Sequence, residues 1–370
     1  MKTFKYRLQP SKSQRTRLVR VLELCRWVYN ETLATRKNAW EQEKKPLSLF
    51  DTHKLLTLWK KEHPELVGVH SQVLQNAQER VDLAFKAFFR RVKAGEKPGY
   101  PRFRGVGWYD SFTFKQFGFE LLEDGLRLSK IGVIKIVLHR PVEGQIKILT
   151  IHRDAVGNWY ACFAFEVEPA LLPVCDLAIG IDFGLESFAT LSNGDRIANP
   201  RFFRRDERAL AQAQRKLSQA EKGTPERSMR CKVVTHIHQR IANRRRDFAH
   251  QRSHELVNRF GLLALENLHI KNMLQNHCLA KSISDAAWNQ WVHYLTYKAE
   301  NAGRVVVLVD PHNTSKRCSG CGTLVEKSLS DRVHHCLVCG LVMDRDHNAA
   351  INILGLGLQS LGYTLKAPRL

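Results

Sequence analysis

The chain is 370 residues long, which is enough for two or three domains with a buried core, and its hydrophobic fraction of 44% is ordinary. Its charge is not ordinary, because 58 lysines and arginines stand against 36 acidic residues, a formal net charge of +22. This excess favours a nucleic-acid partner over a merely solvated basic surface. No apolar run reaches the roughly 20 residues of a membrane span, and the opening "MKTFKYRLQP" lacks the apolar segment of a signal peptide. We therefore expect a cytoplasmic protein without a membrane partner.

The first half of the chain changes from helix patterns to strand patterns. Residues 3–8 alternate in polarity and predict a strand, and helices are predicted from Gln14 onward, near 51–61 and over 71–92. From 111 to 168, short segments of period two lie between turn residues. They predict a small antiparallel barrel, to which the first strand can be added.

A layered α/β pattern begins at residue 176. "DLAIGIDFG" predicts a buried strand that ends in Asp182, and "FATLSNGDRIA" predicts a hairpin that turns at Asn193-Gly194. The elements predicted after it are basic helices over about 201–220 and 226–259, the strand "GLLALEN", a helix around 286–301 and the strand "RVVVLVD". Strands separated by helices indicate a layered α/β domain.

Four cysteines form two CxxC pairs, and fourteen residues separate the pairs. They are Cys318, Cys321, Cys336 and Cys339. Two such turns can place four thiolates tetrahedrally around Zn²⁺. Because sulfur fills all four positions, the zinc has no open position for chemistry, so we expect a structural site rather than reactive or incidental cysteines.

Three carboxylates stand where elements of the α/β half begin or end. Asp182 and Glu266 end buried strands, and carboxylates at such ends can converge. In "MDRDHNAAINIL", Asp344 is placed to cap a helix, which leaves Asp346 in the first turn as the third acid. Three such acids can hold two Mg²⁺ or Mn²⁺ ions for an in-line phosphoryl displacement. Taken alone, each acid has a simpler alternative, a turn cap for Asp182 and a solvent loop for Glu266.

The combination "IGIDFG…LALENL…CSGCG…HHCLVCGLVMDRDHNAAINIL" resembles the TnpB family of insertion-sequence-encoded proteins, which looks ancestral to the type V CRISPR effectors. The resemblance covers nearly the whole chain, including "YRLQPSKSQ" and "GYPRFRG". It implies an α+β multidomain fold. The implied parts are a wedge β-barrel of residues 1–10 and 98–172, a helical recognition insertion of 11–97, a RuvC-like nuclease domain with an RNase H-like fold of 176–312 and 344–358, a zinc ribbon of 313–343 and a tail of 359–370.

The resemblance also implies an activity. A member of this family is expected to be an RNA-guided, divalent-metal-dependent DNA endonuclease that cleaves guide-matched DNA beside a short motif and supports maintenance of the insertion sequence. By motif, Asp182, Glu266 and Asp346 match the catalytic acids, with Mg²⁺ or Mn²⁺ as their metal, and the four cysteines match the zinc module. The implied partners are a guide RNA from the element, double-stranded DNA and displaced single-stranded DNA, and the implied state is a monomer.

Three other functions stay open. The protein could be a nuclease-inactive, guide-dependent DNA-binding regulator, although such a relative is expected to lack acids that are present here. It could be a strand-joining transposase, because RNase H-like sites support either chemistry. The segment "IGIDFGLESFATLSNG" also resembles the phosphate loop of actin-like ATPases, but no second glycine-rich phosphate motif follows it and a zinc ribbon is foreign to that group.

Basic residues concentrate in two places. Residues 201–252 contain fifteen lysines and arginines against five acids, and 90–104 hold a second cluster interleaved with Tyr100 and Phe103. Basic helices can follow phosphate backbones, and exposed aromatic rings can stack on unpaired bases. The alternatives are a solvated helical face and, for the rings, core packing. We assign nucleic-acid contacts to Arg102, Arg104, Arg240, Arg244, Arg245 and Arg246.

Overall fold

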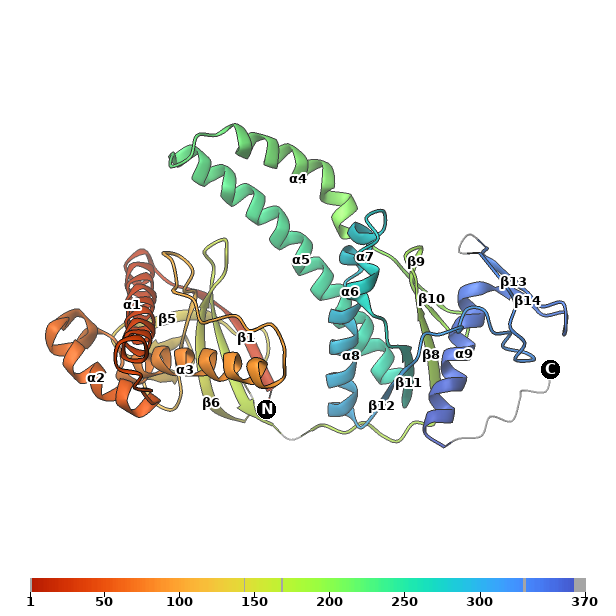
Figure 1. Ribbon diagram of the computed structural model, residues 1–370, viewed down its shortest axis with the longest axis horizontal. Coiled ribbons are helices and arrows are strands. Elements are labelled where there is room, and N and C mark those ends of the chain that lie inside the picture. The colour runs from red at the N-terminus through yellow and green to blue at the C-terminus, as the bar shows by residue number, and fades with distance from the viewer. Residues whose placement is uncertain (1, 143, 168, 329–330, 363–370) are drawn as a thin grey trace. The chain divides into compact units, whose positions relative to one another are not determined.

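A computed structural model describes residues 2–142, 144–167, 169–328 and 331–362. The chain divides into two compact units, Met1–Glu168 and Pro169–Leu370, and each has its own sheet and its own core (Figure 1). None of the helices in these ranges combines the length and the apolar character that a membrane crossing requires.

The first unit is built on a sheet of seven antiparallel strands. In spatial order they are β2 (Ser111–Phe114), β6 (Gln145–Arg153), β7 (Trp159–Glu166), β1 (Lys2–Gln9), β5 (Gly132–Val137), β4 (Leu126–Leu128) and β3 (Phe119–Leu121). The edge strands β2 and β3 follow each other in the chain across a short turn, so the sheet must curl until its edges approach. The rings of Phe114 and Phe119, one from each edge, lie 6.2 Å apart. The predicted barrel is therefore confirmed as a nearly closed sheet that includes the first strand.

Helices are inserted between β1 and β2. They are α1 (Lys12–Glu43), α2 (Leu49–Glu62), the short 3-10 helix Pro64–Gly68 and α3 (Ser71–Lys93). α1 begins two residues before the predicted start because Ser11 caps it: its hydroxyl accepts the Gln14 amide, and the Gln14 side chain accepts the Ser11 amide. Val73, Leu74 and Ala77 in the first half of α3 are buried, whereas Val92 near its end is exposed, and α3 packs on α1.

The second unit contains a mixed five-stranded sheet. Its order is β10 (Arg196–Ala198), β9 (Ser187–Leu191), β8 (Ala178–Phe183), β11 (Leu262–Glu266) and β12 (Val305–Val309). β8, β11 and β12 run parallel, so they need crossover connections. The helices that supply them are α4 (Phe202–Gln219) and α5 (Pro225–Arg259) before β11, then α6 (Ile270–Met273), α7 (Ala280–Ala286) and α8 (Trp288–Ala302) before β12.

The two faces of this sheet are covered by different helices (Figure 1). On one face, Ile181 and Leu265 pack in a core with α5 and α8, where Trp291 is fully buried. The other face is covered by α9 (Arg345–Ser360). α9 approaches closely because Gly180 has no side chain: a Cβ there would lie 2.0 Å from the Ala350 carbonyl oxygen.

Between β12 and α9 the chain forms a small module that contains the four cysteines. Its two strands, β13 (Val333–His335) and β14 (Val342–Asp344), pair antiparallel. Of the predicted tail, α9 extends to Ser360, and residues 363–370 lie outside the described residues.

Candidate metal centres and nucleic-acid interface

Asp182 and Glu266 stand side by side at the carboxyl ends of parallel strands. The last residues paired between β8 and β11 are Ile181 and Leu265, and each acid is the next residue of its strand. Since side chains alternate along a strand, Asp182 shares the face of Gly180, the face that α9 covers. Only 6% of Asp182 and 8% of Glu266 are exposed, so the sheet holds both carboxylates in a buried position.

Asp346 reaches the same place from α9. Asp344 caps this helix, because its Oδ1 accepts the backbone amides of Asp346 at 3.1 Å and His347 at 3.0 Å. The helix runs antiparallel to β8, with Ala350 over Gly180 and Asp346 near Gly184, just beyond the strand. Its amino end, which favours negative charge, therefore lies at the carboxyl ends of β8 and β11. The predicted cap and first-turn positions are both confirmed.

The electrostatics of the acids show that they are close neighbours. Burial raises the pKa of Asp182 well above its ordinary value, and the charges of Glu266, Asp346 and Asp344 raise it further, against the opposing effect of Arg345. Burial also raises the pKa of Glu266, and the hydrogen bond from the Thr314 hydroxyl opposes that rise. A buried carboxylate with other acids beside it, as Asp182 is, is disfavoured in its charged form unless positive charge binds nearby.

The carboxylates fit a site for hard divalent cations. All their metal-ligating atoms are oxygens, which Mg²⁺ and Mn²⁺ prefer. The guanidinium of Arg345 lies beside them and contacts the Asp346 carboxylate at 3.3 Å. The acids are less tightly gathered than the cysteines. Within the described ranges, the four cysteines are the group of potential metal ligands whose ligating atoms all lie within 4.8 Å of one another.

The four cysteines form a compact cluster of thiols. The Sγ atoms of Cys318 and Cys339 lie 3.6 Å apart, as do those of Cys321 and Cys336. Each pair is closed by a glycine in the left-handed region, Gly322 (φ +78°) or Gly340 (φ +74°), whose amide donates to the carbonyl of the first cysteine of its pair. The predicted gathering of the four side chains is confirmed, and the thiol set fits tetrahedral Zn²⁺.

The cysteine module leads directly into the helix that carries Asp346. In the β13–β14 hairpin, Val333 pairs with Asp344, and Asp344 is also the cap of α9. The module therefore fixes the position at which α9 begins.

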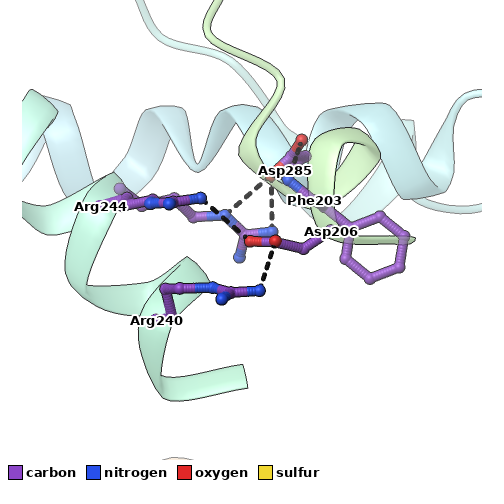
Figure 2. A network of polar contacts seen from close by, with 6 residues as sticks. Phe203, Asp206, Arg240, Arg244 and Asp285 are labelled. Carbon is purple, nitrogen blue, oxygen red and sulfur yellow. Dashed lines mark hydrogen bonds and ion pairs between the residues drawn. The ribbon is translucent and has the colours of Figure 1, made fainter. Parts of the chain in front are cut away.

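Two of the arginines assigned to nucleic acid form ion pairs on α5 (Figure 2). Arg240 and Arg244 each donate to one carboxylate oxygen of Asp206 on α4, at 2.5 and 3.1 Å. Their side chains remain 48% and 46% exposed, whereas that of Asp206 is 11% exposed. These arginines join the α4–α5 hairpin and still present part of each guanidinium to solvent.

Arg245 has an internal role that the sequence analysis did not anticipate. It donates two hydrogen bonds, of 2.9 and 2.7 Å, to Asp285 on α7, and the Asp285 side chain is 6% exposed. Both oxygens of Asp285 also accept the Phe203 amide, at 3.0 and 2.9 Å (Figure 2). Asp285 thus caps α4, which has no side-chain cap of its own at Arg201.

The other three assigned arginines are exposed. Arg246 contacts Asn243 on its own helix. Arg102 and Arg104 lie in a segment without regular structure that is bound to α1, because Asn30 accepts the Arg104 amide at 2.8 Å and donates to its carbonyl at 2.9 Å. In the same segment Phe103 is 54% exposed, which excludes core packing for that ring.

Three protein families match parts of the chain. A family described as a helix-turn-helix domain matches residues 1–45, one described as a probable transposase matches 165–277, and one described as a Cas12f1-like TNB domain matches 288–353. In this structure residues 2–45 contain one strand and one continuous helix, α1, rather than two helices joined by a turn.

Two curated relatives match almost the full chain. A protein of Streptomyces pristinaespiralis named "Putative RNA-guided DNA endonuclease" is 37% identical over 96% of this chain and 89% of its own length. "Putative RNA-guided DNA endonuclease InsQ" of Escherichia coli (strain K12) is 30% identical over 96% of this chain and 92% of its own. The chain belongs to the TnpB family.

The fold of this TnpB-family protein is shared with a chain of known structure. The solved structure described as "Cryo-EM structure of the Cas12f1-sgRNA-target DNA complex" has a TM-score of 0.56 and 15% sequence identity. The match covers 92% of this chain and 82% of the other. At this identity the likeness establishes a common fold.

Several buried polar residues of this TnpB-family protein escaped sequence reasoning. Asp285 lies on the short helix α7 and Thr314 in the segment after β12, and each has its partner tens of residues away. Asn348 could have been found from the sequence. It precedes two alanines on a helix face that is expected to be packed, and an amide side chain at such a position indicates a buried hydrogen-bonding role.

Proposed function

We propose that this protein is an RNA-guided, divalent-metal-dependent DNA endonuclease that cleaves guide-matched DNA next to a short motif and so supports the maintenance of an insertion sequence. The observation that carries the proposal is the meeting of Asp182, Glu266 and Asp346, from two strands and one helix, at one edge of a sheet. The names of the two full-length relatives and the basic charge of the chain support it.

The parts of the chain then take the following roles. The second unit contains a RuvC-like nuclease domain with an RNase H-like fold, formed by residues 176–312 and 344–358, and a zinc ribbon of 313–343. The sheet order, with three parallel strands and an antiparallel hairpin, supports that assignment. The barrel of 1–10 and 98–172 is the wedge, and 11–97 is the recognition insertion.

Asp182, Glu266 and Asp346 would hold the catalytic cations. A bound pair of Mg²⁺ or Mn²⁺ ions supplies Lewis-acid activation of water and stabilises the leaving 3′ oxygen in an in-line displacement. The protein's own contribution is position: the sheet fixes Asp182 and Glu266, and the cap at Asp344 fixes Asp346. Burial keeps bulk water from the carboxylates, which strengthens their attraction for cations.

The four cysteines would hold one Zn²⁺. An all-sulfur ligand set leaves no position for water or substrate, so this ion stabilises the module rather than reacting. Its effect on the nuclease is to define where α9 begins.

Sequence selection is assigned to base pairing rather than to side chains. A guide RNA reads the target, while the protein binds the heteroduplex and the displaced strand through their backbones. Exposed arginines such as Arg102, Arg104 and Arg246, with the exposed parts of Arg240 and Arg244, are suited to phosphates.

The test is a paired purification and cleavage experiment. The protein is produced with the DNA that flanks its gene, and the copurifying RNA is sequenced. The complex is then incubated with Mg²⁺ and a plasmid that carries the matched target beside a randomised flank. We expect one discrete RNA and guide-dependent double-strand cleavage that Asp182→Ala abolishes without loss of RNA binding.

Other outcomes would overturn the proposal. Guide-dependent DNA binding by the wild type without cleavage would favour a regulator, and strand-joined products with element-end DNA would favour a transposase. Undiminished Mg²⁺-dependent cleavage by Asp182→Ala would remove that acid from the site.

A further inference from the structure

One short segment of the chain contacts the elements that carry two of the three acids. It runs from β12 to the first cysteine pair and includes Thr314, which is 3% exposed. The Thr314 Oγ1 donates to the Glu266 Oε1 at 2.5 Å, and the Pro311 carbonyl lies 3.1 Å from the same hydroxyl. Within the part of the chain that the structure describes, Thr314 is the hydrogen-bond donor to the Glu266 carboxylate.

The same segment is bound to the helix of the third acid. Asn348, two residues after Asp346 and fully buried, accepts the Ser319 amide at 2.9 Å and donates to the Arg317 carbonyl at 2.7 Å. Asn352, one turn later, donates to the carbonyls of Thr314 at 2.8 Å and Arg317 at 2.6 Å. Because these bonds are made to backbone atoms, they fix the path of the segment.

The segment also begins the cysteine module. Ser319, whose amide Asn348 accepts, lies between the buried Cys318 and the rest of the first CxxC turn. The Cys318 amide donates to the Thr323 carbonyl, which closes that turn. The position of Thr314 is therefore defined on one side by α9 and on the other by the folded cysteine turn.

A glutamate needs such a contact more than an aspartate does. Glu266 has one more rotatable bond than Asp182, and it is the last residue of its strand. Without a partner its carboxylate can adopt several rotamers, and holding one of them costs conformational entropy. A buried hydroxyl on a fixed backbone selects one rotamer before a cation arrives.

We propose that Thr314 is a positioning residue that aims the Glu266 carboxylate at the divalent-cation site, and that the cysteine module and α9 hold Thr314 in place. This inference rests on the proposed function, because it concerns the metal affinity of the same acids. What is new is that the metal affinity of the carboxylates depends on Thr314, a residue outside the acidic motifs.

The test compares Thr314→Val, which keeps the shape and removes the hydroxyl, with Thr314→Ser, which keeps the hydroxyl. Thr296→Val is the matched control, since the Thr296 hydroxyl donates to the Val292 carbonyl within α8. Binding of MnCl₂ to the full-length, nucleic-acid-free chain is measured by electron paramagnetic resonance of the free ion, with Asp182→Ala as the baseline. Zinc content and the thermal midpoint are measured on every sample.

We expect Thr314→Val to weaken Mn²⁺ binding and to slow guided cleavage, each about 10- to 100-fold, at unchanged zinc content. Thr314→Ser should restore most of both quantities, and Thr296→Val should match the wild type. Thr314→Ala, which cannot overpack the site, is the second variant in case valine disturbs folding, and it should show the same loss.

Three results would overturn the inference. If Thr314→Val and Thr314→Ala bind Mn²⁺ and cleave as the wild type does, the hydroxyl does not position Glu266. If Thr314→Ser is as poor as the valine variant, packing rather than the hydrogen bond is responsible. If the wild type binds no more Mn²⁺ than Asp182→Ala and cleaves nothing, the proposed function itself fails, and the inference fails with it.

Discussion

Replacement of Gly180 by alanine tests how the proposed catalytic site is assembled. The added Cβ would lie 2.0 Å from the Ala350 carbonyl oxygen, 2.7 Å from the Leu354 amide nitrogen and 2.8 Å from the Leu354 Cβ. The nearest of these are backbone atoms of α9, so no side-chain rotation can relieve the contact. The strand and the helix must separate instead.

The size of the separation follows from these distances. Real Cβ atoms essentially never approach other heavy atoms closer than 3.0 Å, so the nearest atom of α9 must withdraw by about 1 Å. Asp346 lies one turn from Ala350 on the same helix and moves with it. A misplacement of about 1 Å costs on the order of 100-fold in rate, or about 2.7 kcal/mol of transition-state stabilisation. Overpacking also lowers the free energy of unfolding by about 1–3 kcal/mol.

The assay is single-turnover cleavage of a matched target by the guide-loaded protein at saturating Mg²⁺, together with thermal unfolding. Gly68→Ala is the matched control, because a Cβ there meets nothing within 4 Å. If Gly180→Ala cleaved at the wild-type rate with an unchanged unfolding midpoint, α9 would not rest on β8 as described, and the placement of Asp346 would be wrong.

Three further predictions concern the cysteine module and the basic helices. Cys336→Ser, which alters a fully buried thiol, should abolish stoichiometric zinc in a colorimetric release assay, whereas the exposed Cys278→Ser should retain it. Asp285→Ala leaves the guanidinium of Arg245 and the amide of Phe203 without their partner, so denaturant titration should give a loss of about 3 kcal/mol, and a loss under about 0.5 kcal/mol would contradict the capping role. Arg246→Ala should lower the slope of log affinity against log salt for nucleic acid by about 1 without affecting stability; an unchanged slope would remove this residue from the interface.

Sequence alone predicted the elements that carry the acids, because their signals are local. The apolar strands ending in Asp182 and Glu266 are short runs bounded by polar residues, and both lie within a residue or so of the observed ends. Asp344 and Asp346 could be given separate positions because a helix cap and a first-turn residue face different ways. The cluster of the four cysteines could also be predicted, because the spacing of the two CxxC pairs is a local signal.

What could not be predicted depends on contacts between distant segments. The partition of the arginines on α5 is the clearest case: neighbours such as Arg245 and Arg246 are equivalent in a list of charges, yet the helical rotation between them aims one at Asp285 and leaves the other exposed. The short strand β3 and the helices α6 and α7 also lacked a periodic signal, since they are too brief for one. Hydrophobic patterning reports burial, and it says little about which buried polar atoms meet.

The order of the elements along the chain determines when the proposed nuclease site is complete. β8, β11 and the whole cysteine module precede α9, so a ribosome produces two acids and their sheet before it produces the helix with the third. Until then the sheet face beside Gly180 lacks α9, the helix that covers it. A chain whose translation stops before residue 346 lacks Asp346, and such a product is expected to leave DNA intact.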